Sequence, residues 1–275
     1  MNSLQDKCIL LTGASRGVGV FIARALAERG ARLALVARSQ DLLQRLANEL
    51  GLQDENALVM GADLTDDGDR RRVVDRVLDV FGNIDILINN AGREAEGAFV
   101  DLSYAEIGKT VELNLLAPMA LTHLILPHML ANKSGHIVNM ASIGGKSGAP
   151  YDATYCGTKA GIAEWTRGLR LEMEGTGVDF STIFPGFVTE VGMFARFNMK
   201  TPWVTGSCTP EQVAAAVVTA ILQKKREIIV NSQPLRPLFA LSALFPNLGD
   251  WLMHRTGVVA FQRRKVGKGG EPQKR

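Results

Sequence analysis

The sequence has few cysteines and no long apolar run. Its only cysteines are Cys8, Cys156 and Cys208, an odd number at wide spacing that fits neither a disulfide framework nor a Cys-x-x-Cys zinc site. The apolar run 8–11 is too short for the core of a signal peptide, and no stretch offers the ~20 uninterrupted apolar residues of a membrane span. We therefore expect a protein of the reducing cytoplasm.

An excess of charge of one sign is also missing. The 275 residues carry 31 basic and 28 acidic side chains, a formal net charge of +3. The basic excess is confined to residues 234–275, which hold eight basic and two acidic residues, whereas the rest of the chain holds 23 and 26. The main body thus lacks the basic surface that nucleic-acid binding usually requires, and we expect no nucleic-acid partner.

The composition is otherwise that of a folded globular chain, with 46% hydrophobic and 21% charged residues. Short apolar segments typical of buried strands occur at 7–12, 33–37, 57–60, 84–89, 136–141, 178–184 and 227–230. Helix-length patterns separate them, which indicates right-handed crossovers. We predict an α/β, doubly wound domain over 1–233, with a seven-stranded parallel sheet and helices on both faces. A C-terminal apolar and basic extension over 234–275 follows it.

Capping residues mark two helix starts. Ser103 opens a long helical stretch that runs to about residue 131, and Thr209 opens another helix with proline in its first turn. We expect Pro118 and Pro127 to interrupt the long stretch, because proline lacks the N–H donor and clashes with the preceding turn.

The first strand ends in a glycine-rich loop, Thr12–Gly19, which leads into apolar residues at helical spacing. A dinucleotide pyrophosphate binds at such a place, because glycines let the backbone approach and a helix N-terminus offers free N–H groups. The spacing Gly-x-x-x-Gly-x-Gly differs from the Gly-x-Gly-x-x-Gly fingerprint. Taken alone, the loop is equally compatible with an ordinary glycine-rich turn.

Tyr155 and Lys159 are four residues apart within a helical pattern, so they share one helix face. A free tyrosine titrates near ~10 and is a poor acid–base catalyst at neutral pH. An ammonium about 4–5 Å away, at an effective dielectric constant of ~20, favours the phenolate by roughly 3–4 kcal/mol. We therefore expect Lys159 to lower the pKa of Tyr155; the alternative is an ordinary exposed helix face.

Further motifs accompany these two. Asn89–Gly92 follows the fourth strand, Asn114 lies in the next helix, Ser142 ends the fifth strand and Pro185–Gly186 follows the sixth. Together, and in this order, the motifs resemble those of the short-chain dehydrogenase/reductase family over about residues 7–230. The resemblance implies an NAD(P)-dependent Rossmann-fold oxidoreductase that forms a homodimer or homotetramer through two long helices.

The resemblance also implies roles for single residues. Tyr155 resembles the family's general acid–base, and Lys159 resembles the residue that lowers its pKa and binds the nicotinamide ribose. Ser142 resembles the hydroxyl that orients the substrate oxygen, and Asn114 the residue that holds a proton-relay water. The implied cofactor site consists of Gly13, Ser15, Arg16, Gly17, Val18, Gly19, Arg38, Asp63, Leu64, Asn90, Gly92, Tyr155, Lys159, Pro185, Gly186, Val188 and Thr189.

The choice of cofactor depends on the end of the second strand, where an acidic residue favours NAD and an arginine favours NADP. Arg38 stands there without an acidic neighbour, and Arg16 adds a cation in the glycine-rich loop. We predict NADP(H), with NAD(H) as second choice; the alternative for Arg38 is a solvated charge at a helix start. His123 and His128 have no carboxylate or cysteine at ligand spacing, so no metal site is predicted.

Residues 187–206 carry an unusual number of apolar and aromatic side chains for a loop. These residues can line a cleft for an apolar small-molecule substrate, form an oligomer contact, or form a short helix packed on the core. Tyr151 is expected to line the substrate cleft. We predict the NADPH-dependent interconversion of a carbonyl and a secondary alcohol on a ketoacyl, steroid-like or lipid substrate. The alternative is a non-catalytic dinucleotide-sensing or scaffold protein on this fold, which the complete set of four catalytic-type residues disfavours.

The extension 234–275 is apolar up to about residue 253 and then basic. Pro246 and Gly249 prevent one straight spanning helix and leave two short amphipathic pieces. With the basic run Arg263–Lys268, such pieces can lie peripherally on an anionic membrane. The alternative is that they cover the substrate cleft or a subunit interface and leave a disordered tail after about Gly267.

Overall fold

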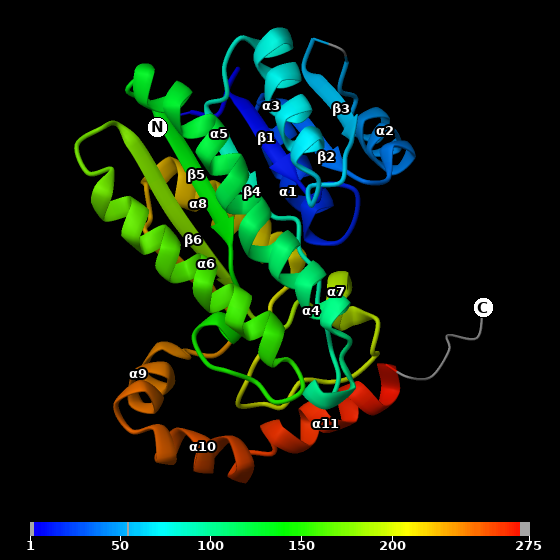
Figure 1. Cartoon of the computed structure of the whole chain (residues 1–275), viewed down its shortest axis with the longest axis vertical. Helices are drawn as coiled ribbons and strands as arrows, with labels where there is room; N and C mark the ends of the chain where they lie inside the picture. The colour runs from blue at the N-terminus through cyan, green and yellow to red at the C-terminus, as the bar shows by residue number, and fades with distance from the viewer. Residues whose placement is uncertain (1–2, 54, 270–275) are drawn as a thin grey trace.

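A computed structural model describes residues 3–53 and 55–269, and its centre is a parallel β-sheet (Figure 1). The strands are β1 Cys8–Thr12, β2 Arg32–Ala37, β3 Ala57–Gly61, β4 Ile86–Asn89, β5 Gly135–Met140, β6 Val178–Pro185 and β7 Glu227–Val230. Their spatial order, β3-β2-β1-β4-β5-β6-β7, reverses direction at β1, as in a doubly wound sheet. The predicted fold class is confirmed, and every strand end lies within two residues of its predicted position.

Helices cover both faces of the sheet. They are α1 Val18–Ala27, α2 Gln40–Glu49, α3 Asp67–Phe81, α4 Tyr104–Val111, α5 Ala117–Ala131, α6 Ala153–Glu172, α7 Gly192–Ala195 and α8 Pro210–Gln223. One apolar core joins the sheet to α1, α2 and α8, and another joins it to α3 and α5. Because both faces are covered, the central strands are buried and mostly apolar; every residue of β1, β4 and β5 is buried.

The predicted helix starts are confirmed. The Ser103 hydroxyl accepts a hydrogen bond from the Glu106 N–H at 3.2 Å. Thr209 and Gln212 form a reciprocal capping box at the start of α8. Both caps satisfy N–H groups that have no partner within the helix, which fixes where these helices begin.

The predicted interruption of the long helix by its prolines is wrong. The chain runs from α4 through the π-helical turn η2, Glu112–Leu116, directly into α5. Pro118 lies in the first turn of α5, where no N–H donor is needed, and Pro127 lies inside a helix that continues to Ala131. Among the described residues, Tyr104–Ala131 is the one helix long and apolar enough to cross a membrane. Its apolar face, with Ile125, is buried against the sheet.

The C-terminal extension forms the two expected short helices, α9 Arg236–Leu244 and α10 Pro246–Arg255. A third helix, α11 Val258–Gly269, covers the basic run. All three pass beneath the carboxyl ends of the strands (Figure 1). Gly249 lets α9 and α10 cross closely, since a Cβ atom there would lie 2.8 Å from the Cβ of Ser242. α11 continues past Gly267, where a disordered tail was expected, and residues 270–275 lie outside the described residues.

Candidate active site

The loops that follow β1 and β4 are locked together. Gly13 has φ +67°, and a Cβ atom there would lie 2.7 Å from the Ala91 Cα. The Asn90 side-chain amide donates to the carbonyl oxygens of Thr12 and Gly13 at 3.0 and 3.1 Å. α1 begins beyond Gly17, and no side chain caps its first N–H groups. This arrangement leaves backbone donors free to bind a pyrophosphate.

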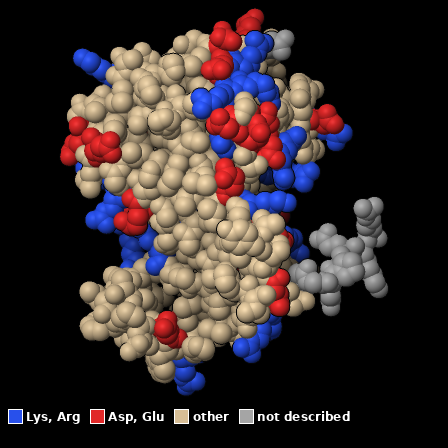
Figure 2. All heavy atoms as spheres, in the orientation of Figure 1, with Lys and Arg blue, Asp and Glu red and all other residues tan. Residues whose placement is uncertain are grey.

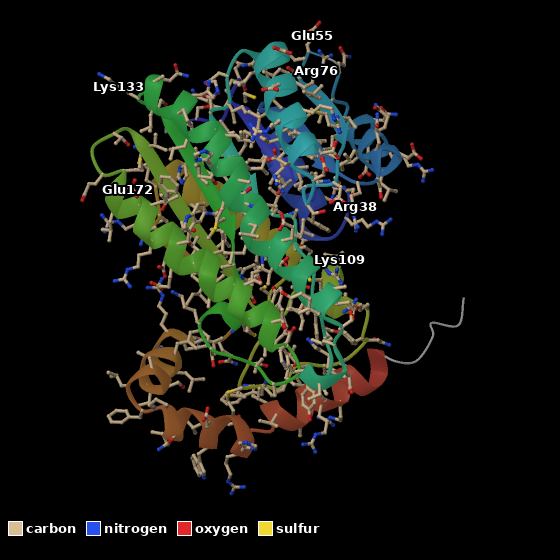
Figure 3. All side chains as sticks on the ribbon, viewed as in Figure 1. Arg38, Glu55, Arg76, Lys109, Lys133 and Glu172 are labelled. Carbon is tan, nitrogen blue, oxygen red and sulfur yellow. The ribbon has the colours of Figure 1, made fainter. Side chains whose placement is uncertain are left out.

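A cavity of about 1160 Å³ opens at the carboxyl ends of the strands. The predicted site residues that line it are Gly13, Ser15, Arg16, Gly17, Val18, Gly19, Arg38, Asp63, Leu64, Asn90, Gly92, Ser142, Tyr155, Lys159, Pro185, Gly186 and Val188. Thr189 is not among the lining residues; its N–H donates to the Cys208 carbonyl at 3.0 Å. Arg38 lines the cavity and is exposed directly after the end of β2 (Figure 3).

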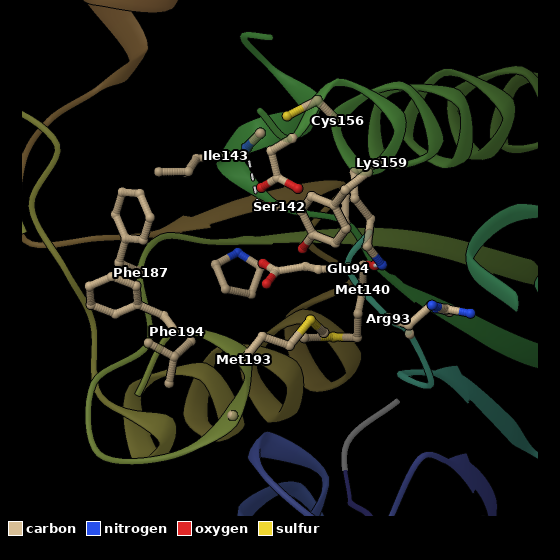
Figure 4. Close-up of a pocket in the computed structure, with 18 of the residues that line it drawn as sticks. Arg93, Glu94, Met140, Ser142, Ile143, Cys156, Lys159, Phe187, Met193 and Phe194 are labelled. Atoms are coloured by element: carbon tan, nitrogen blue, oxygen red, sulfur yellow. Dashed lines mark hydrogen bonds between the residues drawn. The ribbon is translucent and has the colours of Figure 1, made fainter. Parts of the chain in front are cut away.

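Ser142, Tyr155 and Lys159 meet in the middle of this cavity. Ser142 follows β5, and the other two residues lie one turn apart on α6. The Lys159 ammonium donates to the Met140 carbonyl at 2.7 Å and lies 5.7 Å from the centre of the Tyr155 ring. Figure 4 shows Ser142 and Lys159 on the same side of the cavity. The tertiary structure thus brings together three of the four predicted catalytic residues.

Asn114, the fourth, is buried in the π-helical turn η2 behind the cavity wall. Its side-chain oxygen accepts from the Arg93 N–H, and its amide donates to the Arg93 carbonyl, both at 2.8 Å. The same amide donates to the Thr158 hydroxyl at 3.1 Å. Asn114 therefore fixes the backbone that follows Gly92 and with it the direction of the next side chain, Glu94.

The predicted lowering of the Tyr155 pKa is wrong for this arrangement. Burial raises the pKa of Tyr155 above its usual range, and the Glu94 carboxylate acts in the same direction, while the Ser142 hydroxyl opposes both. Burial also lowers the pKa of Lys159 to about 8. The expectation counted only the attraction between the two groups at an effective dielectric constant of ~20, whereas burial is the largest cause of both shifts. Tyr155 therefore keeps its proton at neutral pH.

Comparisons with known proteins agree with this geometry. The model of the short chain dehydrogenase family matches residues 7–201. The chain is 40% identical to the ketoacyl reductase HetN of Nostoc sp., over 97% of this chain and 94% of that protein. It is 30% identical to dehydrogenase/reductase SDR family member 7B of Bos taurus, over 96% and 84%. The chain belongs to the short-chain dehydrogenase/reductase family.

A solved structure supports the same assignment. It is a metagenomic short-chain oxidoreductase in complex with NADP, with a TM-score of 0.71 and 29% identity over 83% of this chain and 98% of that one. The chain is accordingly an NAD(P)-dependent oxidoreductase. The family match ends at residue 201, so α9, α10 and α11 lie beyond it.

The sequence analysis missed a buried ionic cluster at the cavity wall, formed by Glu94, Glu96, Asp152, Arg196 and Lys265. The Lys265 ammonium lies 2.8 Å from a Glu96 oxygen and 3.4 Å from an Asp152 oxygen. Arg196, half-exposed, lies 2.9 Å from Glu96. Lys265 was expected in an exposed basic run, yet only 3% of its side chain is exposed. Two acidic residues, two and four positions after Gly92, were the available signal.

The cluster perturbs several pKa values. Burial raises the pKa of Asp152 to about 6 and raises that of Glu94 well above its usual value. Burial alone lowers the pKa of Lys265, but the carboxylates of Glu94, Asp152 and Glu96 outweigh it and hold that pKa above its usual value. Lys265 is therefore fully charged at neutral pH, whereas Glu94 tends to keep a proton.

The far end of the cavity is apolar. Its lining includes Phe187, Met193, Phe194, Leu235, Leu238, Phe239, Leu252 and Met253. Phe187 and Phe194 also pack against Phe261 of α11, with their ring centres 5.5 and 6.0 Å from that of Phe261. The apolar loop thus lines the cavity and packs on the extension at once. Tyr151 is not among the lining residues, contrary to expectation; its hydroxyl accepts from Arg263 at 2.9 Å.

Proposed function

We propose that the protein is an NADPH-dependent carbonyl reductase, or in reverse a secondary-alcohol dehydrogenase, for apolar substrates. The observation that carries this proposal is the position of Tyr155. Its phenol lies in a cavity that has arginines at one end and apolar side chains at the other. The relative that is called a ketoacyl reductase supports a carbonyl substrate.

The chemistry divides between cofactor and protein. A bound NADPH supplies the hydride that the carbonyl carbon accepts. Tyr155, protonated at neutral pH, donates its hydroxyl proton to the carbonyl oxygen, and Ser142 donates a hydrogen bond that orients this oxygen. Lys159, which lines the cavity, would hold the nicotinamide ribose, and Asn114 holds the wall behind it.

The preference for NADP rests on charge at the end of β2. Arg38 and Arg16 are both exposed and line the cavity, so their guanidinium groups can donate hydrogen bonds to a 2′-phosphate. The position directly after β2 holds Arg38 and not an acidic residue, whose carboxylate would accept a hydrogen bond from the 2′-hydroxyl of NAD. The solved relative that binds NADP supports this choice, and NAD(H) remains the second cofactor.

The substrate range follows from the apolar wall, which the loop 187–206 and the extension build together. We expect ketoacyl, steroid-like or lipid ketones to fit better than small polar ones. The test is NADPH consumption against ketones graded by chain length and ring size. Turnover that rises with apolar size supports the proposal; NADPH binding without turnover of any ketone would leave a dinucleotide-sensing protein.

Surface features support further parts of the proposal. Leu116 and Leu171 are exposed on the long-helix face, where a homodimer or homotetramer would form.

On α9 and α10 the exposed large residues are Leu241, Leu244, Phe245, Leu248 and Trp251. Figure 2 shows few charges over this part of the surface and basic side chains at its edge. We propose a cytoplasmic protein that contacts anionic membranes peripherally through this face.

Deleting the extension cannot test membrane contact, because its helices also line the cavity. Replacing Leu244 and Trp251 by serine changes only exposed side chains, 74% and 57% exposed. Co-sedimentation with anionic vesicles at low salt should decrease in this variant, because two apolar side chains that would enter the membrane interface are lost. The basic residues, about 1 kcal/mol each near anionic lipid, are unchanged. Equal sedimentation of both proteins, or equal sedimentation with neutral vesicles, would exclude the membrane contact.

A further inference from the structure

A second cavity of about 750 Å³ adjoins the catalytic cavity. Its lining comes from the loop 144–150, the first turns of α6, α10 and Val259 of α11, and Figure 1 shows the start of α6 above α10. The residues that line both cavities are Gly144, Ser147, Gly148, Ala149, Cys156 and Met253. The two cavities therefore share a wall, to which the loop and Met253 of α10 both contribute.

The shared wall is thin beside the reacting centre. A Cβ atom on Gly144 would lie 3.5 Å from the Ser142 hydroxyl oxygen and 3.7 Å from the Tyr155 ring. At Gly148 the wall has free space, because a Cβ atom there would have no neighbour within 4 Å among the described residues. Figure 4 shows Ser142 and Cys156 on the same side of the catalytic cavity. A chain attached to a ketone at Tyr155 thus has a short path into the second cavity.

The lining of the second cavity is mainly apolar. Its apolar side chains are Pro150, Ala153, Ala160, Met253 and Val259. Asp250 and His254 of α10 are exposed, so their charged or titratable groups reach solvent. The Lys146 ammonium lies 2.9 Å from a Glu227 oxygen and 4.1 Å from the centre of the Phe184 ring, so its charge is already paired. This lining favours a hydrocarbon chain over a charged group.

We propose that the second cavity binds the distal part of a long apolar chain whose keto group is held at Tyr155. The chain leaves the apolar end of the catalytic cavity beside Met253, which lines both cavities. Long-chain ketones, such as long ketoacyl compounds, are then favoured over short ones. The inference rests on the proposed carbonyl reductase activity, and it adds the site that selects substrates by chain length.

Gly157 offers a way to fill the second cavity alone. It lies on α6 and lines the second cavity but not the catalytic one. A Cβ atom there would have no neighbour within 4 Å in the described part of the chain, so Gly157→Phe can place a ring in this space without loss of helix propensity. Gly157→Leu adds a smaller side chain at the same place. Gly168→Phe is the matched control, because Gly168 is exposed on the same helix, has similar free space and lines neither cavity.

The experiment compares two ketones with the same reacting group, one with a hexyl and one with a tetradecyl chain. The readout is the ratio of their kcat/KM values, long chain over short chain. Each methylene group that leaves water is worth up to about fourfold in this ratio, the equivalent of about 0.8 kcal/mol. Gly157→Phe should therefore lower the ratio about tenfold or more, because its ring takes the place of several methylene groups, and Gly157→Leu should lower it less. The hexyl ketone in both variants, and both ketones in Gly168→Phe, should keep kcat/KM within about twofold of wild type.

The outcomes separate the inference from the proposed function. If both Gly157 variants leave the ratio unchanged, or lose activity equally on the two ketones, the second cavity does not bind the chain and the inference is wrong. An equal fall of the ratio in Gly168→Phe also overturns it, because a ring on α6 outside the cavity would then suffice. If wild type binds NADPH but reduces neither ketone, the proposed function itself is wrong, and the inference falls with it.

Discussion

Replacing Lys265 by methionine removes the cation that attaches α11 to the cavity wall. The side chain is 3% exposed and ion-pairs with Glu96 and Asp152, which are 8% and 7% exposed. Breaking a buried pair by removing one partner typically costs about 3–5 kcal/mol, because the other charges stay buried and uncompensated. Methionine preserves the volume, so the loss concerns charge and not packing.

Hydrogen exchange along α11 measures this loss. Because every 1.4 kcal/mol is a factor of ten, the α11 amides should exchange at least about 100-fold faster than in wild type. Arg264→Met, one position earlier and exposed, is the matched control and should leave exchange unchanged. If Lys265→Met exchanges at the wild-type rate, or no faster than Arg264→Met, the ion pairs do not hold the extension and the reasoning fails.

Other predictions concern the catalytic domain. Tyr155→Phe should lower kcat by ~10²–10⁴ with NADPH binding retained, and a loss below tenfold would refute Tyr155 as the acid. Arg38→Asp should shift the kcat/KM ratio of the two cofactors toward NADH; an unchanged ratio would refute its phosphate role. Burial lowers the pKa of His136 from 6.5 to about 4, so the imidazole is neutral in the fold. The free energy of unfolding should therefore fall by up to about 3 kcal/mol as the pH drops through this window. Urea titrations of wild type and His136→Gln check this, and parallel pH slopes would contradict it.

The sequence by itself determined the sheet and the position of the cofactor loop. Apolar runs of strand length alternate with helical periodicity, and these patterns are local, so they can be recognised without the tertiary structure. The same holds for the capping boxes and for the four-residue spacing of Tyr155 and Lys159. The long helix was misjudged, because whether a proline breaks a helix depends on its position within the turn and on the packing around it.

Only the tertiary structure decided the electrostatics of the site. Lys265 meets Asp152 from 113 residues away, and no local pattern contains such a contact. The direction of the Tyr155 pKa shift also depended on burial, which the spacing to Lys159 does not reveal. Glu94 lines the cavity, and Glu96 has the nearest cation, only because the fold brings these segments together. Desolvation and charge pairing depend on which distant segments meet, and folding decides that.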